Sequence, residues 1–160
     1  MIDIERMDWR LPSMGILGVA GMVLLGLADE RTSAQTLWAE IYTSAWEGIY
    51  TADQASRGEP LYKTRCASCH GATLEGSENG PPLSGRDFAQ DWNCANIADL
   101  FEKIQFTMPG NRAGRLNDDQ IADILAYILQ TNRFPSGRSA LPASADDLRG
   151  IRFLAVNPSQ

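Results

Sequence analysis

The stretch C-A-S-C-H at residues 66–70 constrains this chain more than any other part of it. Two thiols three positions apart, followed at once by an imidazole, form the pattern through which a c-type haem is attached. The thiols add to the two vinyl groups of one porphyrin, so they must lie a short and fixed distance apart. The histidine is then held under the ring, where it can bind the iron. We therefore predict one covalent haem c, held by Cys66, Cys69 and His70.

Two other kinds of site also use closely spaced cysteines. A structural zinc site needs four ligands, and the chain offers only one further cysteine, Cys94, and no second histidine. A thioredoxin-like redox pair lies in a strand–helix–strand context, which the neighbouring sequence does not show. We therefore prefer haem. Cys94 is expected to be a free thiol, buried as a small apolar side chain, with a regulatory or cross-linking role as the alternative.

The second axial ligand is suggested by a count of the methionines. Four of the five lie within the first 22 residues, in a segment that we expect to be removed. Met108 remains, and Pro109 and Gly110 follow it, so that a helical run should end there in a rigid loop. Because histidine and methionine are an established pair of haem ligands, we predict that His70 and Met108 bind the iron. The alternative is that Met108 only fills a gap in the core.

Residues 71–96 are rich in Gly, Pro, Ser and Asn, and we expect a loop there. A ligating histidine normally donates its second ring N–H to an acceptor, and we assign this acceptor to the carbonyl of Pro81. The alternative is that the prolines only stiffen the loop. Arg86 and Trp92 are candidate donors to the haem propionates, although Arg86 is equally suited to solvent. Three apolar side chains are the expected walls of the pocket: Leu83, Phe88 and Trp92.

Residues 1–34 have the features of a signal peptide. Residues 14–28 are uncharged and mostly apolar, a run that is too short for a typical membrane-spanning helix. Small residues offer a cleavage site before Gln35, but acidic residues outnumber basic ones ahead of the apolar run. A start at Met7 would reduce this disagreement. The alternative is an uncleaved anchor, the only case in which we expect membrane association. Both alternatives predict an exported, periplasmic domain, in agreement with haem attachment outside the bacterial cytoplasmic membrane.

A chain of 160 residues has room for one domain beside a leader and a tail. Its formal charge is −6, and a chain that begins at Gln35 loses three basic and five acidic residues and keeps a charge of −4. Such a charge favours partners with basic docking patches, although the local distribution of charge matters more than the total. No basic run interleaved with aromatic residues indicates nucleic-acid binding.

Apolar spacing predicts how the chain is divided. Residues 35–50 are expected to form a helical arm that packs over the core, or else a docking face for a partner. Six apolar side chains make up its stripe: Trp38, Ile41, Tyr42, Trp46, Ile49 and Tyr50. A capping box at Thr51 and Gln54 should begin a helix that leads to the haem cysteines. Pro60 should kink this helix, or a new helix should begin near Glu59.

Two further helices and a tail complete the expected all-α fold. Asn96 should cap a helix that ends near Thr107, and Asn117 should cap a strongly amphipathic helix that ends before Phe134. In residues 135–160 we expect one or two helical turns after Ser144, followed by fraying.

Residues 51–134 resemble the class I c-type cytochromes. The resemblance depends on the C-x-x-C-H motif, G-P-x-L at residues 80–83, Met108, and A-Y-I at residues 126–128. It implies an all-α fold of three to five helices around one covalent haem. It also implies that a glycine and an aromatic residue of the first helix pack against the last helix; the matching positions are Gly58, Tyr62, Ile124 and Tyr127. Residues 46–51 are similar, less specifically, to small cytochromes that accompany quinoprotein dehydrogenases.

These features favour an exported mono-haem electron carrier over an enzyme. A sixth position filled by Met108 would leave no site on the iron for substrate or oxygen. The carrier would exchange single electrons with redox proteins such as a periplasmic dehydrogenase or oxidase. One alternative is a cytochrome subunit of a periplasmic dehydrogenase complex, held through the arm. The other is a haem sensor or enzyme with a displaceable sixth ligand.

Overall fold

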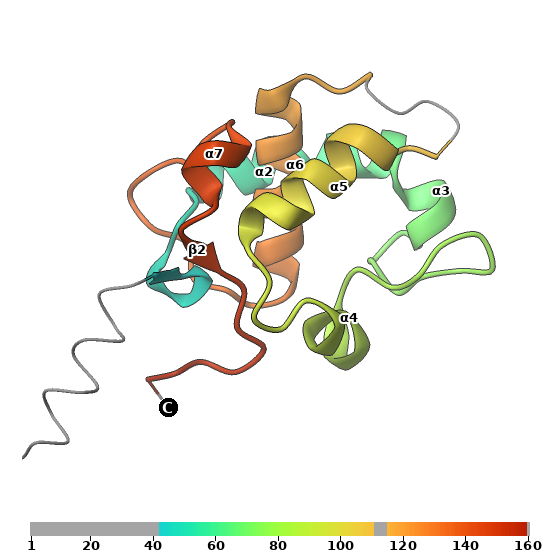
Figure 1. Cartoon of the computed structure of the whole chain (residues 1–160). Helices are drawn as coiled ribbons and strands as arrows, with labels where there is room; N and C mark the ends of the chain where they lie inside the picture. The colour runs from blue at the N-terminus through green and yellow to red at the C-terminus, as the bar shows by residue number, and fades with distance from the viewer. Residues whose placement is uncertain (1–41, 111–114, 160) are drawn as a thin grey trace, which may run out of the picture. The chain divides into compact units, whose positions relative to one another are not determined.

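The computed structural model describes residues 42–110 and 115–159, which lie within a compact unit that spans Leu37–Gln160. The predicted leader and the first part of the arm, residues 1–41, lie outside the described residues. Figure 1 shows the elements in chain order: β1 (Thr43–Ser44), the 3-10 helix η1 (Ala45–Glu47), α2 (Ala52–Arg65), α3 (Ala67–His70), α4 (Gly85–Asp91), α5 (Ile97–Thr107), α6 (Asp118–Thr131), α7 (Ala145–Leu148) and β2 (Ile151–Arg152).

The mainly α-helical fold predicted from the sequence is confirmed. The described residues contain six α-helices, where three to five were expected, and two of the six, α3 and α7, are single turns of four residues. Strand structure in this part of the chain is limited to the short pair β1–β2 and two isolated bridges. No helix among the described residues has both the length and the apolar character needed to cross a membrane.

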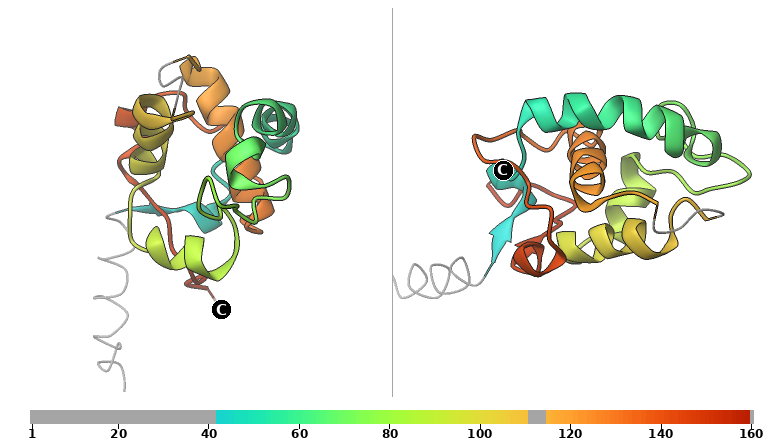
Figure 2. Two further views of the ribbon diagram at one scale, coloured as in Figure 1. Left: turned by 90° about the vertical axis from the view of Figure 1, so that its right-hand side faces the viewer. Right: turned by 90° about the horizontal axis from the view of Figure 1, so that it is seen from above.

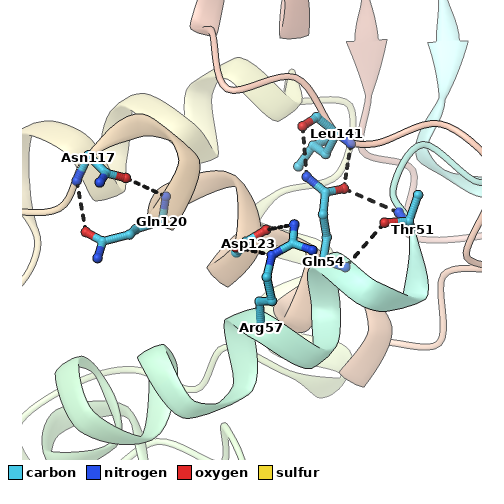
Figure 3. A network of polar contacts seen from close by, with 7 residues as sticks. All are labelled: Thr51, Gln54, Arg57, Asn117, Gln120, Asp123 and Leu141. Carbon is cyan, nitrogen blue, oxygen red and sulfur yellow. Dashed lines mark hydrogen bonds and ion pairs between the residues drawn. The ribbon is translucent and has the colours of Figure 1, made fainter.

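The two longest helices begin where the sequence predicted. Thr51 and Gln54 form a capping box at the start of α2, and Asn117 and Gln120 form one at the start of α6 (Figure 3). In each box a side chain accepts from a backbone N–H at the helix start, and the third helical residue bonds back to the capping residue. Each box thus satisfies two of the backbone donors that a helix start leaves unpaired, which makes four in the two helices.

No new helix begins near Glu59, because α2 continues through Pro60 from Ala52 to Arg65. A proline inside a helix removes the bond to the carbonyl four residues earlier, here that of Ser56. Both Ser56 and Pro60 are exposed, so water can satisfy the free carbonyl and the helix can continue.

Helix α6 forms the centre of the domain, with α2 along one side and α5 along the other (Figure 2). Its stripe of Ile121, Ile124, Leu125 and Leu129 is fully buried, as the apolar spacing predicted. Gly58 of α2 lies so close to α6 that an added Cβ would be 1.9 Å from the carbonyl oxygen of Asp123. The rings of Tyr62 and Tyr127 meet nearby, 5.4 Å apart. These contacts are those that the resemblance implied.

The predicted helical arm is wrong for residues 42–50, which form β1, η1 and a turn instead. Thr43 and Ser44 pair in parallel with Ile151 and Arg152 of β2, so a partner distant in sequence replaces local helical bonds. Gly48, at a φ of 73°, ends η1 in a left-handed conformation. These residues still pack over the core, as expected: Tyr50 is buried, and its hydroxyl donates to the carbonyl of Phe134 at 2.6 Å.

The C-terminal tail is ordered beyond the turn α7 that Ser144 was predicted to cap. The expected fraying is wrong, because Leu141 and Phe153 are buried in the core on either side of α7. The side chain of Gln54 donates to the carbonyl of Leu141 at 3.0 Å and accepts from its N–H at 2.6 Å (Figure 3). The tail is therefore part of the folded domain.

Two expectations about residues 71–96 are also wrong. Helix α4 forms within the segment that was expected to be a loop, with Phe88 as its only buried residue. One apolar anchor in seven residues is too weak a pattern to indicate an amphipathic helix. Cys94 is exposed rather than buried, and it adopts a φ of 67°.

Candidate functional site

A cavity of about 740 Å³ lies among helices α2 to α6, in the range of about 300–1,000 Å³ that is usual for cofactor sites. Eight of the residues expected to contact haem line it: Cys66, Cys69, His70, Pro81, Leu83, Phe88, Trp92 and Met108. Arg86 is exposed and is not among the lining residues. Segments from opposite ends of the domain therefore meet around one space.

The cysteines are held by the junction of α2 and α3. Cys66 ends α2, with its N–H donating to the carbonyl of Tyr62 at 2.8 Å. Its own carbonyl accepts from Cys69 at 3.1 Å and from His70 at 3.0 Å. This turn places the two thiols three residues apart in a helix, where side chains share a face. Burial, with a smaller contribution from Cys69, raises the pKa of the free Cys66 thiol to about 11.

His70 makes the contact that was predicted for it. Its Nδ1 lies 2.8 Å from the carbonyl oxygen of Pro81, and the residue is 7% exposed. A carbonyl only accepts, so Nδ1 carries the proton in this hydrogen bond and Nε2 keeps its lone pair. The imidazole is thus held in the tautomer that can bind a metal through Nε2.

The loop that carries Pro81 is fastened to the haem-binding motif by several bonds. The N–H of Gly76 donates to the carbonyl of His70 at 2.8 Å, and the hydroxyl of Ser77 donates to the carbonyl of Cys69 at 2.6 Å. Tyr62 adds a bond from its hydroxyl to the carbonyl of Gly71 at 2.7 Å. Burial raises the pKa of this phenol. The orientation of His70 therefore depends on α2 as well as on the loop.

Met108 follows α5 directly. Its N–H donates to the carbonyl of Ile104 at 3.1 Å, which fixes its backbone to the last turn of the helix. Its side chain is half-buried and lines the same cavity as His70. Both predicted axial ligands are therefore in the wall of one space.

The sequence did not single out the cationic side chains that line the cavity; among the described residues these are Arg65, Lys103 and Arg115. All three are exposed, and none forms an ion pair with another residue of the described ranges. Asp91 is the acidic residue among the lining side chains. Two of these positions could have been inferred from their neighbours, because Arg65 directly precedes Cys66 and Lys103 lies one helical turn beyond Leu100. The cavity is thus more basic than the net charge of −6 suggests.

The apolar wall opposite the haem-binding motif comes from α5 and α6. Leu100 and Ile104 of α5 and Ile124 and Ile128 of α6 line the cavity together with Leu116. The spacing of the four helical residues, but not Leu116, was recognised in the sequence as part of the apolar helix faces. Several of these residues therefore belong to both the core and the cavity.

Comparison with known proteins places the site in a family. Residues 53–128 match the family described as cytochrome c oxidase, cbb3-type, subunit III. A cytochrome c of Chlamydomonas reinhardtii is 29% identical over 101 residues, which cover 49% of this chain and 90% of that protein. The cbb3-type cytochrome c oxidase subunit CcoP of Rubrivivax gelatinosus is 25% identical, over 69% of this chain and 37% of that subunit.

One further relative and one solved structure were also found in the comparison. The cytochrome bc1 complex cytochrome c subunit of Corynebacterium diphtheriae is 33% identical, over 56% of this chain and 31% of that subunit. The chain thus spans about a third of the length of the oxidase and bc1 subunits that it matches. The match to a chain in the crystal structure of the sulfane dehydrogenase SoxCD from Paracoccus pantotrophus covers 86% of this chain and 68% of that chain. Its TM-score is 0.46, and the two sequences are 20% identical.

The cavity fits the group that this family carries. Two thiols and an imidazole come from one helical turn, the imidazole is held in a metal-binding tautomer, and the opposite wall is apolar. The match of residues 53–128 and the cytochrome c relative support a class I c-type cytochrome domain, a type of domain that carries covalently attached haem c.

Proposed function

We propose that this protein is an exported one-electron carrier whose haem iron is bound by His70 and Met108. One observation carries the proposal: both side chains line a single cavity together with the two thiols of the attachment motif. Bound haem supplies an iron that alternates between the ferrous and ferric states, while the protein sets its potential and its access to solvent.

The side chains divide the work of holding the cofactor. Cys66 and Cys69 would attach the haem through thioether bonds, and the Pro81 carbonyl would keep His70 oriented to bind the iron. Met108 would be the second protein ligand, so that no site on the iron would be left for a small substrate or oxygen molecule. This is the reason that the protein is proposed to be a carrier rather than an enzyme.

The charges around the cavity bear on the partner. Arg65, Lys103 and Arg115 place positive charge in the lining of the cavity. We propose that these cations balance the two propionate carboxylates, and that the ring edge at the thioethers of Cys66 and Cys69 is the electron port. The names of the relatives, an oxidase subunit and bc1 subunits, support a larger oxidoreductase as the partner. The chain would act as a free carrier or as a subunit of such a complex.

The location is proposed from the sequence alone. Residues 1–34 would direct the domain to the periplasm and be removed there, or remain as an anchor. Mass spectrometry of the purified protein distinguishes the two, since a mature chain that begins at Gln35 lacks the apolar run of residues 14–28.

An absorption spectrum tests the proposed ligation. Methionine bound to ferric haem gives a weak near-infrared band from sulfur to iron, and we expect it in the wild-type protein. We expect Met108→Ala to lose the band and, when reduced, to bind carbon monoxide rapidly. A high-spin ferric wild-type protein would instead support the alternative of a sensor or enzyme with an open sixth site.

A further inference from the structure

The chain ends in a segment that is bonded across the junction of α4 and α5. We call residues 151–155, which lie outside the family match at 53–128, the C-terminal clamp. The N–H of Cys94 donates to the carbonyl of Phe153 at 2.8 Å, and the N–H of Phe153 donates to the carbonyl of Ala95 at 2.9 Å. The clamp is thus paired with the backbone that joins the two helices.

Side chains on both segments extend this pairing. A guanidinium nitrogen of Arg152 donates to the carbonyl of Cys94 at 2.7 Å. The N–H of Ala155 donates to the side-chain oxygen of Asn93 at 2.9 Å. Each residue of 93–95 therefore has at least one bond to the clamp.

The junction held by the clamp connects two walls of the haem cavity. On one side, α4 contributes Phe88 and is followed by Trp92. On the other side, α5 contributes Leu100 and Ile104 and is followed directly by Met108. A shift at this junction would move an aromatic wall and the residue proposed as sixth ligand relative to each other.

The side chain of Phe153 completes the connection. It is fully buried, and its ring meets that of Phe88 edge-on, at 88° and 5.7 Å between centroids. Phe88 lines the cavity and contacts Trp92 in turn, at 6.3 Å. On its other side Phe153 contacts Phe134, which follows α6, at 4.9 Å. Phe153 therefore fills the space behind the aromatic wall.

We propose that Phe153, at the centre of the C-terminal clamp, is a positioning residue that keeps Met108 at the sixth position of the iron. This inference rests on the proposed ligation by His70 and Met108. A thioether is a soft ligand, and it binds the harder ferric ion less well than the ferrous ion. The ferric bond therefore depends strongly on how firmly the protein holds Met108. The clamp supplies this rigidity from outside residues 53–128, the range that matches the family.

The test uses the full, haem-loaded protein with Phe153→Ala. We expect the near-infrared sulfur-to-iron band to fall to less than half of its wild-type intensity at neutral pH. Carbon monoxide should bind to the reduced variant at least about tenfold faster, because Met108 leaves the iron more often. Phe153→Leu, which refills most of the space, should restore both values to within about twofold. The haem itself should stay attached, since the thioether bonds are unchanged.

Two controls separate positioning from general loss of stability. Leu141→Ala removes another buried side chain, one that does not line the cavity. It should lower the unfolding temperature but leave the band and the carbon monoxide rate unchanged. Val156→Ala changes a residue that is 74% exposed, just beyond the clamp, and should alter none of these quantities.

If Phe153→Ala does not fold, the variants Asn93→Ala and Arg152→Ala test the role of the clamp instead. Each removes a single bond of the clamp and leaves no cavity in the core, and each should shift both readouts in the same direction by a smaller amount. If every clamp variant keeps the near-infrared band and the carbon monoxide binding rate of the wild type, the role of Phe153 is overturned, while the proposed ligation by Met108 still stands. A wild-type protein that lacks the band would overturn the proposed ligation, and the role of Phe153 with it.

Discussion

The Nδ1 atom of His70 lies 2.8 Å from the carbonyl oxygen of Pro81, eleven residues further along the chain. This bond fixes the tautomer of the only histidine in the protein. A hydrogen bond of this kind also makes the imidazole a more basic ligand. A more basic ligand favours the ferric over the ferrous ion, so the loop geometry should help to set the reduction potential.

Gly80→Ala tests this effect on the potential. An added Cβ would lie 2.8 Å from the carbonyl oxygen of Cys69 and 3.1 Å from Nδ1 of His70, which forces the loop away. We expect a weaker bond to Pro81 and a potential that rises by tens of millivolts, since about 59 mV corresponds to a tenfold change for one electron. Protein-film voltammetry measures the shift.

Gly150→Ala is the matched control for this potential, because nothing lies within 4 Å of its added Cβ. It should leave the reduction potential unchanged. A potential for Gly80→Ala that equals or falls below that of the wild type would contradict the proposed influence of Pro81.

Gly58→Ala should destabilise the fold, although alanine is the better helix former by about 1 kcal/mol. The added Cβ would lie 1.9 Å from the backbone oxygen of Asp123, and helices α2 and α6 would have to separate. Overpacking of this kind typically costs about 1–3 kcal/mol. Because the clash is with backbone, we expect a loss near the upper end of that range in the free energy of unfolding. Denaturant titration measures it, and a more stable variant would refute the close approach.

Gln54→Ala should release the segment that leads into the tail. The amide of Gln54 satisfies both backbone groups of Leu141, which is buried (Figure 3). Each buried group left unpaired costs about 1–3 kcal/mol. We expect faster hydrogen exchange and proteolysis in residues 136–143, with an unchanged haem spectrum. Gln105→Ala, which breaks an exposed bond to Asp118, is the control and should have little effect.

The pH dependence of stability should depend in part on Tyr62. Burial raises the pKa of its phenol in the folded protein above the ordinary value of 10.0. Above this value the unfolded chain loses the proton while the folded protein keeps it. The contribution of Tyr62 to the free energy of unfolding is therefore complete below about pH 10, and it declines as the pH rises toward the pKa of the phenol in the folded protein.

Tyr62→Phe should lose about 1 kcal/mol at neutral pH, because the bond from its hydroxyl to the carbonyl of Gly71 is missing. Its stability should decline less steeply above about pH 10 than that of the wild type. Denaturant unfolding at neutral and alkaline pH gives both values. Tyr42→Phe, at an exposed position, is the control. An equally steep decline for Tyr62→Phe would exclude Tyr62 as a source of the alkaline effect.

Much of the site follows from residues that are neighbours in the sequence. The C-x-x-C-H motif identified the cofactor, because its chemistry depends on spacing within five residues. Thr51, Asn96 and Asn117 identified three helix starts, because capping joins groups within one turn. The buried stripe of α6 followed from its helical period. The carbonyl of Pro81 was found because a ligating imidazole needs an acceptor and the nearby loop offered one.

Other features were decided by contacts between distant parts of the chain. Residues 42–50 have helical apolar spacing, yet β1 pairs with β2, and Trp46 donates to the carbonyl of Leu154, 108 residues away. Cys94 is exposed, and its N–H donates to the carbonyl of Phe153, which is distant in sequence. The cations of the cavity come from three separate segments.

The sequence by itself thus predicted the residues that would attach the cofactor, and it determined the type of cofactor and the main helices, because these depend on short-range chemistry and local periodicity. Only the tertiary structure decided that the two ends of the domain pair with each other and that the tail supports the wall of the haem cavity. No local pattern specifies such pairings, since the free energy that favours them comes from burying surfaces that meet only after the chain has folded.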